Sequence, residues 1–122
     1  MKGKSPLQQK SFAFALRMIE LSKYLVSKRE YVFSDQILRS GTSIGANIEE
    51  GLGGHSKKEF SLKISISYKE ARETLYWLNL LKESEIITNK QAASLLKDCE
   101  ELLRILGTAK ITLRSTTNQT GQ

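Results

Sequence analysis

The side chains in this sequence that could carry out catalysis are few: there is one histidine, His55, and one cysteine, Cys99. His55 lies in a stretch rich in glycine and serine and has no evident acidic partner in the sequence to orient its ring for proton transfer. Cys99 falls on an apolar stripe, where a cysteine acts as a small core residue. A nucleophile needs a base beside it. We therefore predict that the protein is not an enzyme.

Metal and nucleotide sites are also not predicted. A di-iron site in a helical bundle is built from Glu-x-x-His motifs, and the sequence contains none, although Glu70 and Glu73 have the same spacing. The glycines at 51, 53 and 54 precede a helix start, where a phosphate could bind. They follow a helix rather than a strand, and no Gly-Lys-Ser/Thr follows them. A single cysteine excludes an internal disulfide and a cysteine-rich zinc site, so we expect no cofactor and no metal.

Positive charge is the strongest chemical signal in the sequence. The net charge is +6, and residues 1–31 hold seven Lys and Arg against two acidic residues. A basic surface attracts polyanions, chiefly nucleic acid; the alternative is a solvated lysine face that only keeps the protein soluble. The candidate nucleic-acid contacts are Lys2, Lys4, Lys10, Arg17, Lys23, Lys28 and Arg29, together with Lys57 and Lys58.

The elements that must position these side chains are amphipathic helices. Apolar residues recur at steps of three and four along most of the chain, and the sole proline, Pro6, is close to the N-terminus. This spacing is typical of helices with one buried face. The predicted helices run from Pro6 to Lys28, Ser34 to Glu50, Lys57 to Glu83 and Asn89 to Arg114.

Capping residues support these helix starts. Ser5 and Ser34 stand where a hydroxyl can accept a bond from the first backbone amides of a helix. Ser56 with Glu59, and Thr88 with a glutamine three residues later, have the spacing of capping boxes, in which the two side chains bond reciprocally to the backbone.

The second helix is unusually rich in small residues and carries a polar stripe. Its glycines, Gly41 and Gly45, each cost about 1 kcal/mol relative to alanine, so we infer close packing on more than one side. If the second and third helices fold back on each other, Arg39 pairs with Glu70 or Glu73 in a partly buried network. The alternative is that these side chains face water. The predicted network comprises Gln36, Arg39, Ser43, Asn47, Glu50, Glu70 and Glu73, with Asn47 and Glu50 tying the turn near Phe60.

Short connections between four helices make neighbours antiparallel. The predicted fold is therefore all-α, an antiparallel up-down-up-down four-helix bundle formed by residues 1–114, with a disordered polar tail at residues 115–122. No apolar run approaches the roughly 20 residues that span a bilayer, and no apolar stretch follows the basic N-terminus as in a signal peptide. We expect a cytoplasmic protein without a membrane partner.

Three motifs resemble those of a known bacterial family. The first is Ser-Ile-x-x-Asn-Ile-x-Glu-Gly at residues 43–51, and the second is Ser-Lys-x-Glu-Phe at residues 56–60. The third is Glu-Ala-x-Glu-Thr, followed by aromatic residues and a leucine, at residues 70–78. Over residues 8–113 the chain resembles the four-helix-bundle proteins first noted as products of intervening sequences in the large-subunit rRNA gene.

This resemblance implies an assembly and partners. It implies a homo-pentamer around a central pore. It also implies kinship with the accessory variability protein of diversity-generating retroelements, which binds a reverse transcriptase and nucleic acid through a basic surface. It implies no catalytic residues, and the motif residues themselves look architectural.

Two functions stay open at this point. The first is a non-enzymatic, oligomeric accessory protein that binds RNA or DNA, mostly by electrostatic attraction. The alternative is a protein-interaction scaffold, for example a partner of a reverse transcriptase, without direct nucleic-acid binding.

Overall fold

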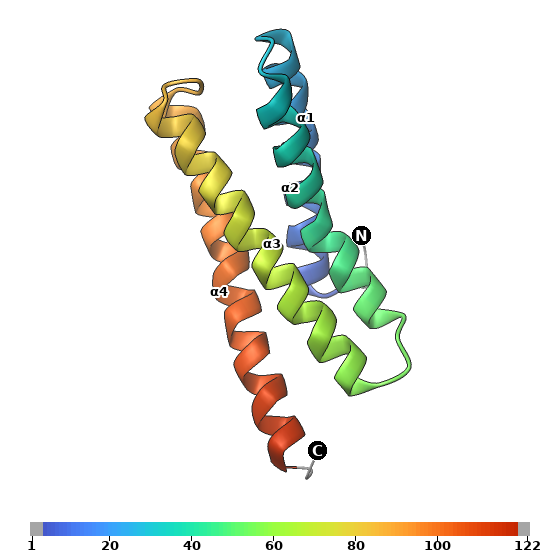
Figure 1. Cartoon of the computed structure of the whole chain (residues 1–122). Coiled ribbons are helices and arrows are strands. Elements are labelled where there is room, and N and C mark those ends of the chain that lie inside the picture. Colours follow the sequence, from blue (N-terminus) through green and yellow to red (C-terminus); the bar gives the residue numbers. More distant parts are fainter. Residues whose placement is uncertain (1–3, 120–122) are drawn as a thin grey trace.

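The computed structural model describes residues 4–119, and side chains as far as Ser115. Within this range the chain forms helices and turns, without a strand. Figure 1 shows the helices running antiparallel in up-down-up-down order, which confirms the predicted all-α four-helix bundle. The helices are α1 (Pro6–Ser27), α2 (Tyr31–Leu52), α3 (Lys57–Glu83) and α4 (Asn89–Gln119).

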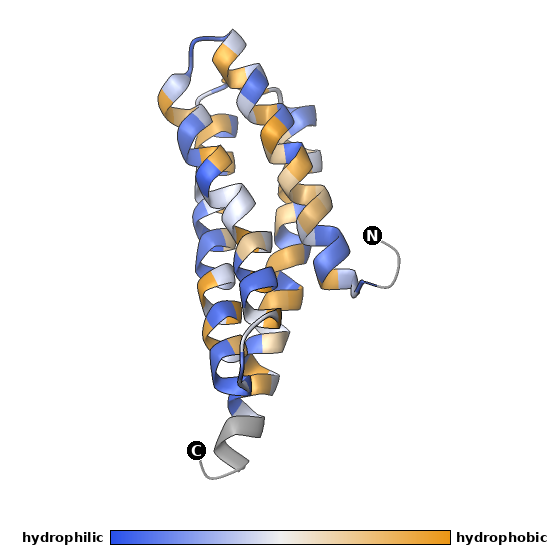
Figure 2. Ribbon diagram, turned by 90° about the vertical axis from the view of Figure 1, so that its right-hand side faces the viewer, coloured by the Kyte–Doolittle hydropathy of each residue, from blue (hydrophilic) through white to orange (hydrophobic). Residues whose placement is uncertain are grey.

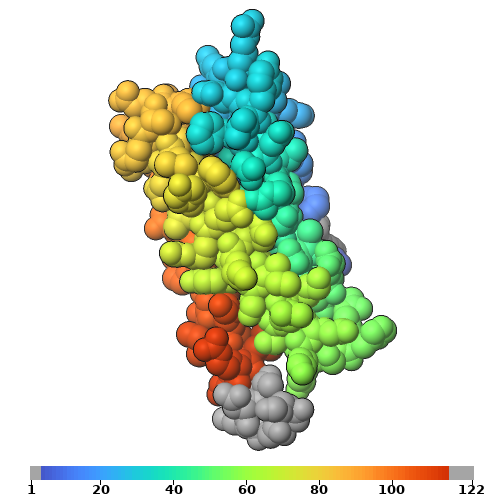
Figure 3. Space-filling model, in the orientation of Figure 1, coloured from blue at the N-terminus to red at the C-terminus, as the bar shows by residue number. Residues whose placement is uncertain are grey.

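The helices pack as two hairpins, α1–α2 and α3–α4, which contact each other mainly through α2 and α3. α1 packs along α2, α2 along α3 and α3 along α4, whereas α1 and α4 meet over a much smaller area. The turns of the α1–α2 and α3–α4 hairpins lie at the same end of the molecule (Figure 1). Figure 3 shows the elongated face on which α2 and α3 lie side by side. No helix in the described range is both long and apolar enough to cross a membrane.

One apolar core runs along the bundle axis. Its members recur at helical spacing, so each helix turns one stripe inward. Burying a large aliphatic or aromatic side chain stabilises the fold by about 1.5–3 kcal/mol. The largest fully buried apolar side chains are Phe14, Met18 and Leu25 on α1, Ile37, Ile44 and Ile48 on α2, Ile64, Leu78 and Leu81 on α3, and Leu102 and Leu106 on α4.

Glycines on α2 allow its neighbours to approach on two sides. A Cβ atom at Gly41 would lie 2.9 Å from Met18 Cβ of α1, closer than real side chains pack. A Cβ atom at Gly51 would lie 3.0 Å from Lys63 Cβ of α3. The inference that α2 is packed on more than one side is confirmed.

Hydroxyl groups bridge the helices inside this core. Ser34 Oγ of α2 donates to the Ser22 carbonyl of α1 at 3.0 Å. Ser67 Oγ of α3 donates to the Ile44 carbonyl of α2 at 2.8 Å. Among the described side chains, every buried nitrogen or oxygen has a partner. These bonds avoid the loss of stability that a buried polar group without a hydrogen-bond partner would cause.

The predicted start of the second helix at Ser34 is wrong. α2 begins at Tyr31 and its N-cap, Glu30, makes no side-chain capping bond. The chain reverses through Arg29, whose φ of 63° lies in the left-handed region. Ser34 is therefore inside the helix, where its hydroxyl binds α1 instead of capping α2.

The other predicted caps are mostly present. Ser5 and Gln8 form a capping box on α1, and Thr88 and Gln91 exchange both bonds before α4. Ser56 caps α3 through the Glu59 amide. The Glu59 carboxylate, however, accepts from the His55 N–H rather than from Ser56, which is a correction to the predicted box.

Helix α4 runs five residues past the predicted end at Arg114, to Gln119. Residues 115–119 contain neither glycine nor proline, so no residue there breaks a helix. The predicted disordered tail is therefore helical over its first part, and residues 120–122 lie outside the described range.

Candidate nucleic-acid interface

Two of the basic residues predicted on α1 are paired with acidic residues of α4. Lys10 Nζ lies 3.2 Å from Glu101 Oε1, and Arg17 Nη1 lies 2.6 Å from Asp98 Oδ2. Arg17 also donates to the Ser94 carbonyl and hydroxyl. A phosphate would have to compete with these carboxylates for the two basic side chains. Both side chains therefore serve to join α1 to α4, the neighbouring helices with the least contact.

The remaining predicted cations on the first segment lie at opposite ends of the bundle. Lys23, Lys28 and Arg29 are exposed near the end of α1, and Lys28 Nζ lies 5.6 Å from the centre of the Tyr24 ring. Lys4 precedes the start of the same helix, which is about 33 Å long at 1.5 Å per residue. Lys2 lies outside the described residues. The first segment therefore does not present its charge as one surface.

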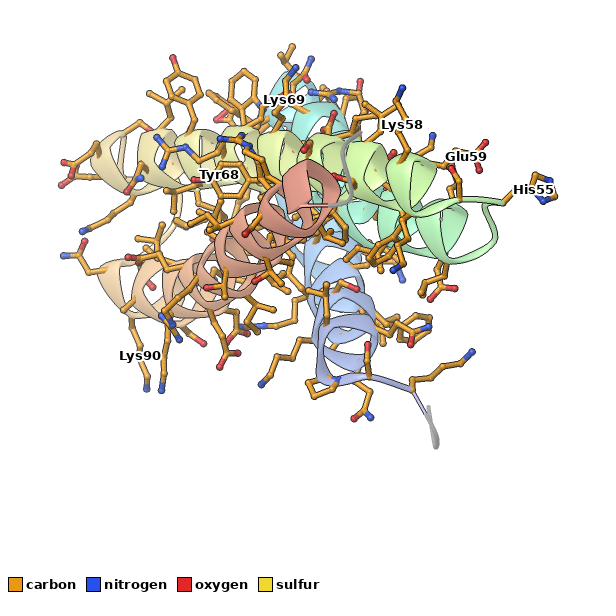
Figure 4. All side chains as sticks on the ribbon, turned by 90° about the horizontal axis from the view of Figure 1, so that it is seen from below. His55, Lys58, Glu59, Tyr68, Lys69 and Lys90 are labelled. Carbon is orange, nitrogen blue, oxygen red and sulfur yellow. The ribbon has the colours of Figure 1, made fainter. Side chains whose placement is uncertain are left out.

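Lys57 and Lys58 are exposed in the first turn of α3. Figure 4 shows Lys58 pointing away from the bundle, with His55 at the tip of the preceding turn. The structure brings them to the end of the bundle that also holds the start of α1, since Gln8 Nε2 donates to Glu49 Oε1 near the end of α2.

A second basic surface, which sequence reasoning missed, lies between α3 and α4. Here a shallow groove of about 370 Å³ contains three cationic side chains and no carboxylate. Lys110 Nζ lies 4.5 Å from the centre of the Tyr68 ring, in cation–π contact. We call this the α3–α4 groove; it is lined by Tyr68, Leu103, Arg104, Gly107, Thr108, Lys110, Ile111 and Arg114.

The predicted pairing across α2 and α3 is present in the structure. Arg39 Nη1 lies 3.3 Å from Glu70 Oε2, and Nη2 contacts Glu73 Oε2. Gln36 Oε1 accepts two bonds from the same guanidinium. Trp77 Nε1 donates to Glu73 at 2.8 Å, a member that sequence reasoning missed. The Arg39 side chain is 48% exposed, whereas the Glu70 and Glu73 side chains are 23% and 35% exposed, so the network is partly buried, as predicted.

Two other predicted members, Ser43 and Asn47, do not join the helices, whereas Glu50 does. Ser43 Oγ donates to the Arg39 carbonyl and Asn47 Nδ2 to the Ser43 carbonyl, both within α2. Their side chains fold back onto their own helix, as serine and asparagine commonly do. Glu50 accepts from Lys63 Nζ of α3 at 2.8 Å, so it does join two helices.

Of the two potentially reactive side chains, His55 lies in the exposed turn before α3 and Cys99 lies in the core. Cys99 is buried and its Sγ lies 3.5 Å from the Ala71 carbonyl. Burial, with smaller effects from Glu100 and Asp98, raises the pKa of this thiol from 9.0 to about 12. A thiol in this state is a poor nucleophile at neutral pH. Among the described residues, no cluster of histidine, cysteine and acidic side chains could hold a metal ion.

The outer side of the α1–α2 hairpin is apolar. Phe12 and Leu16 of α1 are each 51% exposed, and Leu38 of α2 is 39% exposed. Between the two helices lies a groove of about 170 Å³ whose walls include Phe12, Ala15 and Ala46. Figure 2 shows apolar colouring along much of α1, the helix that leads to the N label. We call Phe12, Ala15, Leu16, Leu38 and Ala46 the α1–α2 apolar face.

Comparison with known families and structures gives a family match and a similar crystal structure. Residues 4–108 match the family model described as 23S rRNA-intervening sequence protein. A crystal structure of a protein of unknown function from the S23 ribosomal protein family of Bacteroides thetaiotaomicron VPI-5482 is 45% identical in sequence. It superposes with a TM-score of 0.82 over 85% of this chain and 97% of that chain. The comparison with curated proteins gives no match.

Proposed function

Because the chain belongs to the 23S rRNA-intervening sequence protein family, we propose that it is a non-enzymatic, oligomeric accessory protein of the cytoplasm that binds RNA or DNA. The observation that carries the proposal is unneutralised positive charge. The sequence has 19 Lys and Arg against 13 acidic residues. In the described part, only Lys10, Arg17, Arg39 and Lys63 take part in ion pairs.

Binding of this kind is driven by phosphate neutralisation. Each Lys or Arg that contacts a phosphate releases condensed counterions from the nucleic acid. This release makes the free energy of binding more favourable at low salt. Such contacts carry little sequence information. We therefore expect affinity for RNA and DNA alike, with a strong dependence on salt and without any chemical change in the bound strand.

We also propose that the protein is a homo-oligomer, with the pentamer that the resemblance implies as the expected state. The support is the α1–α2 apolar face, because large exposed apolar side chains gathered on one face are typical of interaction sites. Several copies of one basic surface in a ring would bind a single strand by avidity, since each contact raises the effective concentration of the next.

Fluorescence anisotropy with labelled single-stranded RNA and DNA of matched sequence tests the proposed function. The full chain should bind both at low salt, and unlabelled competitor should reverse the binding. Absence of binding to either strand at low salt would contradict the proposal. Multi-angle light scattering of the same sample measures the number of subunits.

The second candidate is a protein-interaction scaffold, for example a partner of a reverse transcriptase. The α1–α2 apolar face favours it, since apolar surface fits a protein partner better than a phosphate backbone. Co-purification of such a partner after complete nuclease digestion, by a chain that binds no nucleic acid, would favour the scaffold over the first candidate.

A further inference from the structure

The α3–α4 groove combines a cationic rim with an apolar floor. Arg104, Lys110 and Arg114 supply the cations; Leu103 is buried beneath them, and Ile111 is an exposed apolar side chain at the same groove. The charge changes along α4, because the neighbouring groove on its N-terminal half is lined by Asp98 and two glutamates as well as by basic residues. Arg104 lies at the border and also lines that acidic groove, whereas Lys110 and Arg114 line the α3–α4 groove, whose lining residues include no carboxylate.

Tyr68 holds one of these cations in place. Its ring is half-buried and packs against the core, so it is a fixed platform. Lys110 Nζ lies over the ring at 4.5 Å, which restrains an otherwise flexible side chain. Gly107 leaves the edge of the ring open, because a Cβ atom there would lie 3.5 Å from Tyr68 Cε2. Figure 4 shows Tyr68 between α3 and α4, with Lys69 on the outer side of α3.

The spacing of the cations suits the sugar-phosphate backbone of a nucleic acid. Arg104 and Arg114 are ten residues apart on one helix, which is about 15 Å along its axis. This distance exceeds the roughly 3.4 Å rise between successive phosphates of a duplex strand, so the two arginines can contact different phosphates of one strand. Ile111 and the open edge of the Tyr68 ring can contact bases that are not stacked in a duplex, as proteins that bind single strands do with apolar and aromatic side chains.

We infer that the α3–α4 groove, rather than α1, is the principal contact for nucleic acid, and that it binds the backbone of a single strand. This inference rests on the proposed function. It differs from the predicted interface on α1, where Lys10 and Arg17 are paired with acidic residues and the other cations are divided between two ends of the bundle.

Two variants with the same change of charge separate the two surfaces. Each replaces three exposed or half-exposed cations by glutamine in the full chain. The groove variant carries Arg104→Gln, Lys110→Gln and Arg114→Gln. The α1 variant carries Lys23→Gln, Lys28→Gln and Arg29→Gln. Thermal melting by circular dichroism verifies that both fold before their affinities are compared.

The probe is a fluorescent oligouridylate, titrated over a range of salt concentrations. The groove variant should bind at least about tenfold more weakly than the parent at low salt. Its slope of log affinity against log salt should fall in magnitude by about 2, since each phosphate contact with a single strand contributes about 0.7. The α1 variant should keep the parental slope. Equal losses in the two variants, or a parental slope in the groove variant, would overturn the inference.

Tyr68 provides a test that does not change the charge. Tyr68→Phe keeps the ring under Lys110, whereas Tyr68→Leu removes it. An exposed cation–π contact corresponds to about a two- to fivefold change in affinity, so Tyr68→Leu should weaken oligouridylate binding by that factor and Tyr68→Phe should not. Equal affinities for the two variants, at equal melting temperatures, would contradict the role given to the ring.

The outcomes distinguish this inference from the proposed function. If the parent chain binds no nucleic acid at low salt, the proposed function itself fails. If the parent binds and only the α1 variant loses affinity, the function stands and the inference fails. A duplex of the same length should bind more weakly than the single strand; stronger duplex binding would contradict the single-strand assignment. Loss of a protein partner by the groove variant, with oligouridylate binding intact, would assign the groove to that partner instead.

Discussion

Two glycines one turn apart on α2 differ in how closely α1 approaches them. A Cβ atom at Gly41 would overlap the inner atoms of the Met18 side chain, including Cβ at 2.9 Å. At Gly45 the nearest atom would be Ser11 Oγ at 3.3 Å, followed by its Cβ at 3.5 Å. Gly41 is thus required for the α1–α2 contact, while Gly45 has room for a small side chain with a slight adjustment.

We predict opposite effects for alanine at these two positions. Gly41→Ala should lower the free energy of unfolding by about 1–3 kcal/mol through overpacking, despite a gain of about 1 kcal/mol in helix propensity. Gly45→Ala, the matched control, should leave stability unchanged or raise it by up to about 1 kcal/mol. Urea denaturation measures both. A Gly41→Ala variant as stable as the parent would show that α1 and α2 are less closely packed than described.

Cys99 makes stability depend on pH above neutrality. Its pKa is about 12 in the folded chain against 9.0 for an unperturbed thiol. Above pH 9 the unfolded chain therefore loses this proton while the folded chain keeps it, so the free energy of unfolding falls as pH rises. Below pH 9 the thiol is protonated in both states and contributes no pH dependence.

We predict that this loss of stability disappears in Cys99→Ala. The parent should be the more stable protein at pH 7, because alanine leaves a small cavity, and its advantage should shrink between pH 9 and pH 11. Denaturant titrations of both proteins across this range measure the difference, in which the titration of tyrosine and lysine cancels. An advantage that stays constant with pH would contradict the buried thiol.

At the scale of the elements, Arg39 joins α2 to α3 through a half-exposed guanidinium. Arg39→Ala removes its bonds to Glu70 and Glu73 and leaves those two carboxylates near each other. Because exposed ion pairs contribute little, the expected loss is about 1 kcal/mol or less, or a decrease of a few degrees in melting temperature. The control is Arg72→Ala, which replaces an exposed arginine of α3 that takes no part in the ion pairs described above. This variant should melt like the parent. The same melting temperature for Arg39→Ala would exclude a stabilising role for the network.

The helices could be predicted because their apolar residues repeat with a helical period and because side chains such as Ser5 and Thr88 cap them. The start of α2 could not be predicted in this way. It depends on Arg29 adopting a left-handed backbone conformation, which no residue pattern indicates, since glycine is the usual residue there. Ser34 resembled a cap, and only the position of α1 gave its hydroxyl another partner.

The candidate interface was less predictable than the fold. The Arg39 pairing follows from folding α2 and α3 back on each other, so it could be predicted from the sequence. The partners of Lys10 and Arg17 are more than 75 residues away on α4, and local charge cannot reveal them. The α3–α4 groove was hidden because acidic residues in the N-terminal half of α4 offset the basic residues in its C-terminal half when charge is summed over the helix.

At the scale of the whole molecule, the two surfaces belong to different hairpins. The α1–α2 apolar face lies on one hairpin, and the α3–α4 groove lies on the other. The two surfaces share no residue, so we expect an assembly held together by the first surface to keep one accessible groove on every copy. Several grooves on one particle would bind a long strand more tightly than a short one, because successive contacts are intramolecular.

We predict that charges placed on the α1–α2 apolar face dissociate the assembly. The parent should have a mass several times that of the 13.8 kDa chain in light scattering, and five times if it is the implied pentamer. Leu16→Glu with Leu38→Glu should reduce this mass, since unpaired charges are costly in an interface. Val32→Glu, at an exposed position outside this face, is the control. A parent of monomer mass would refute the oligomer, and an unchanged mass in the double variant would place the interface elsewhere.

The dependence of RNA affinity on salt tests the central claim most directly. It is measured on the parent chain with a single-stranded RNA, as the slope of log affinity against log salt concentration. If at least three cations of the α3–α4 groove neutralise phosphates, the slope should be about −2 or steeper. A slope near zero, or no detectable binding at the lowest salt concentration, would contradict the account.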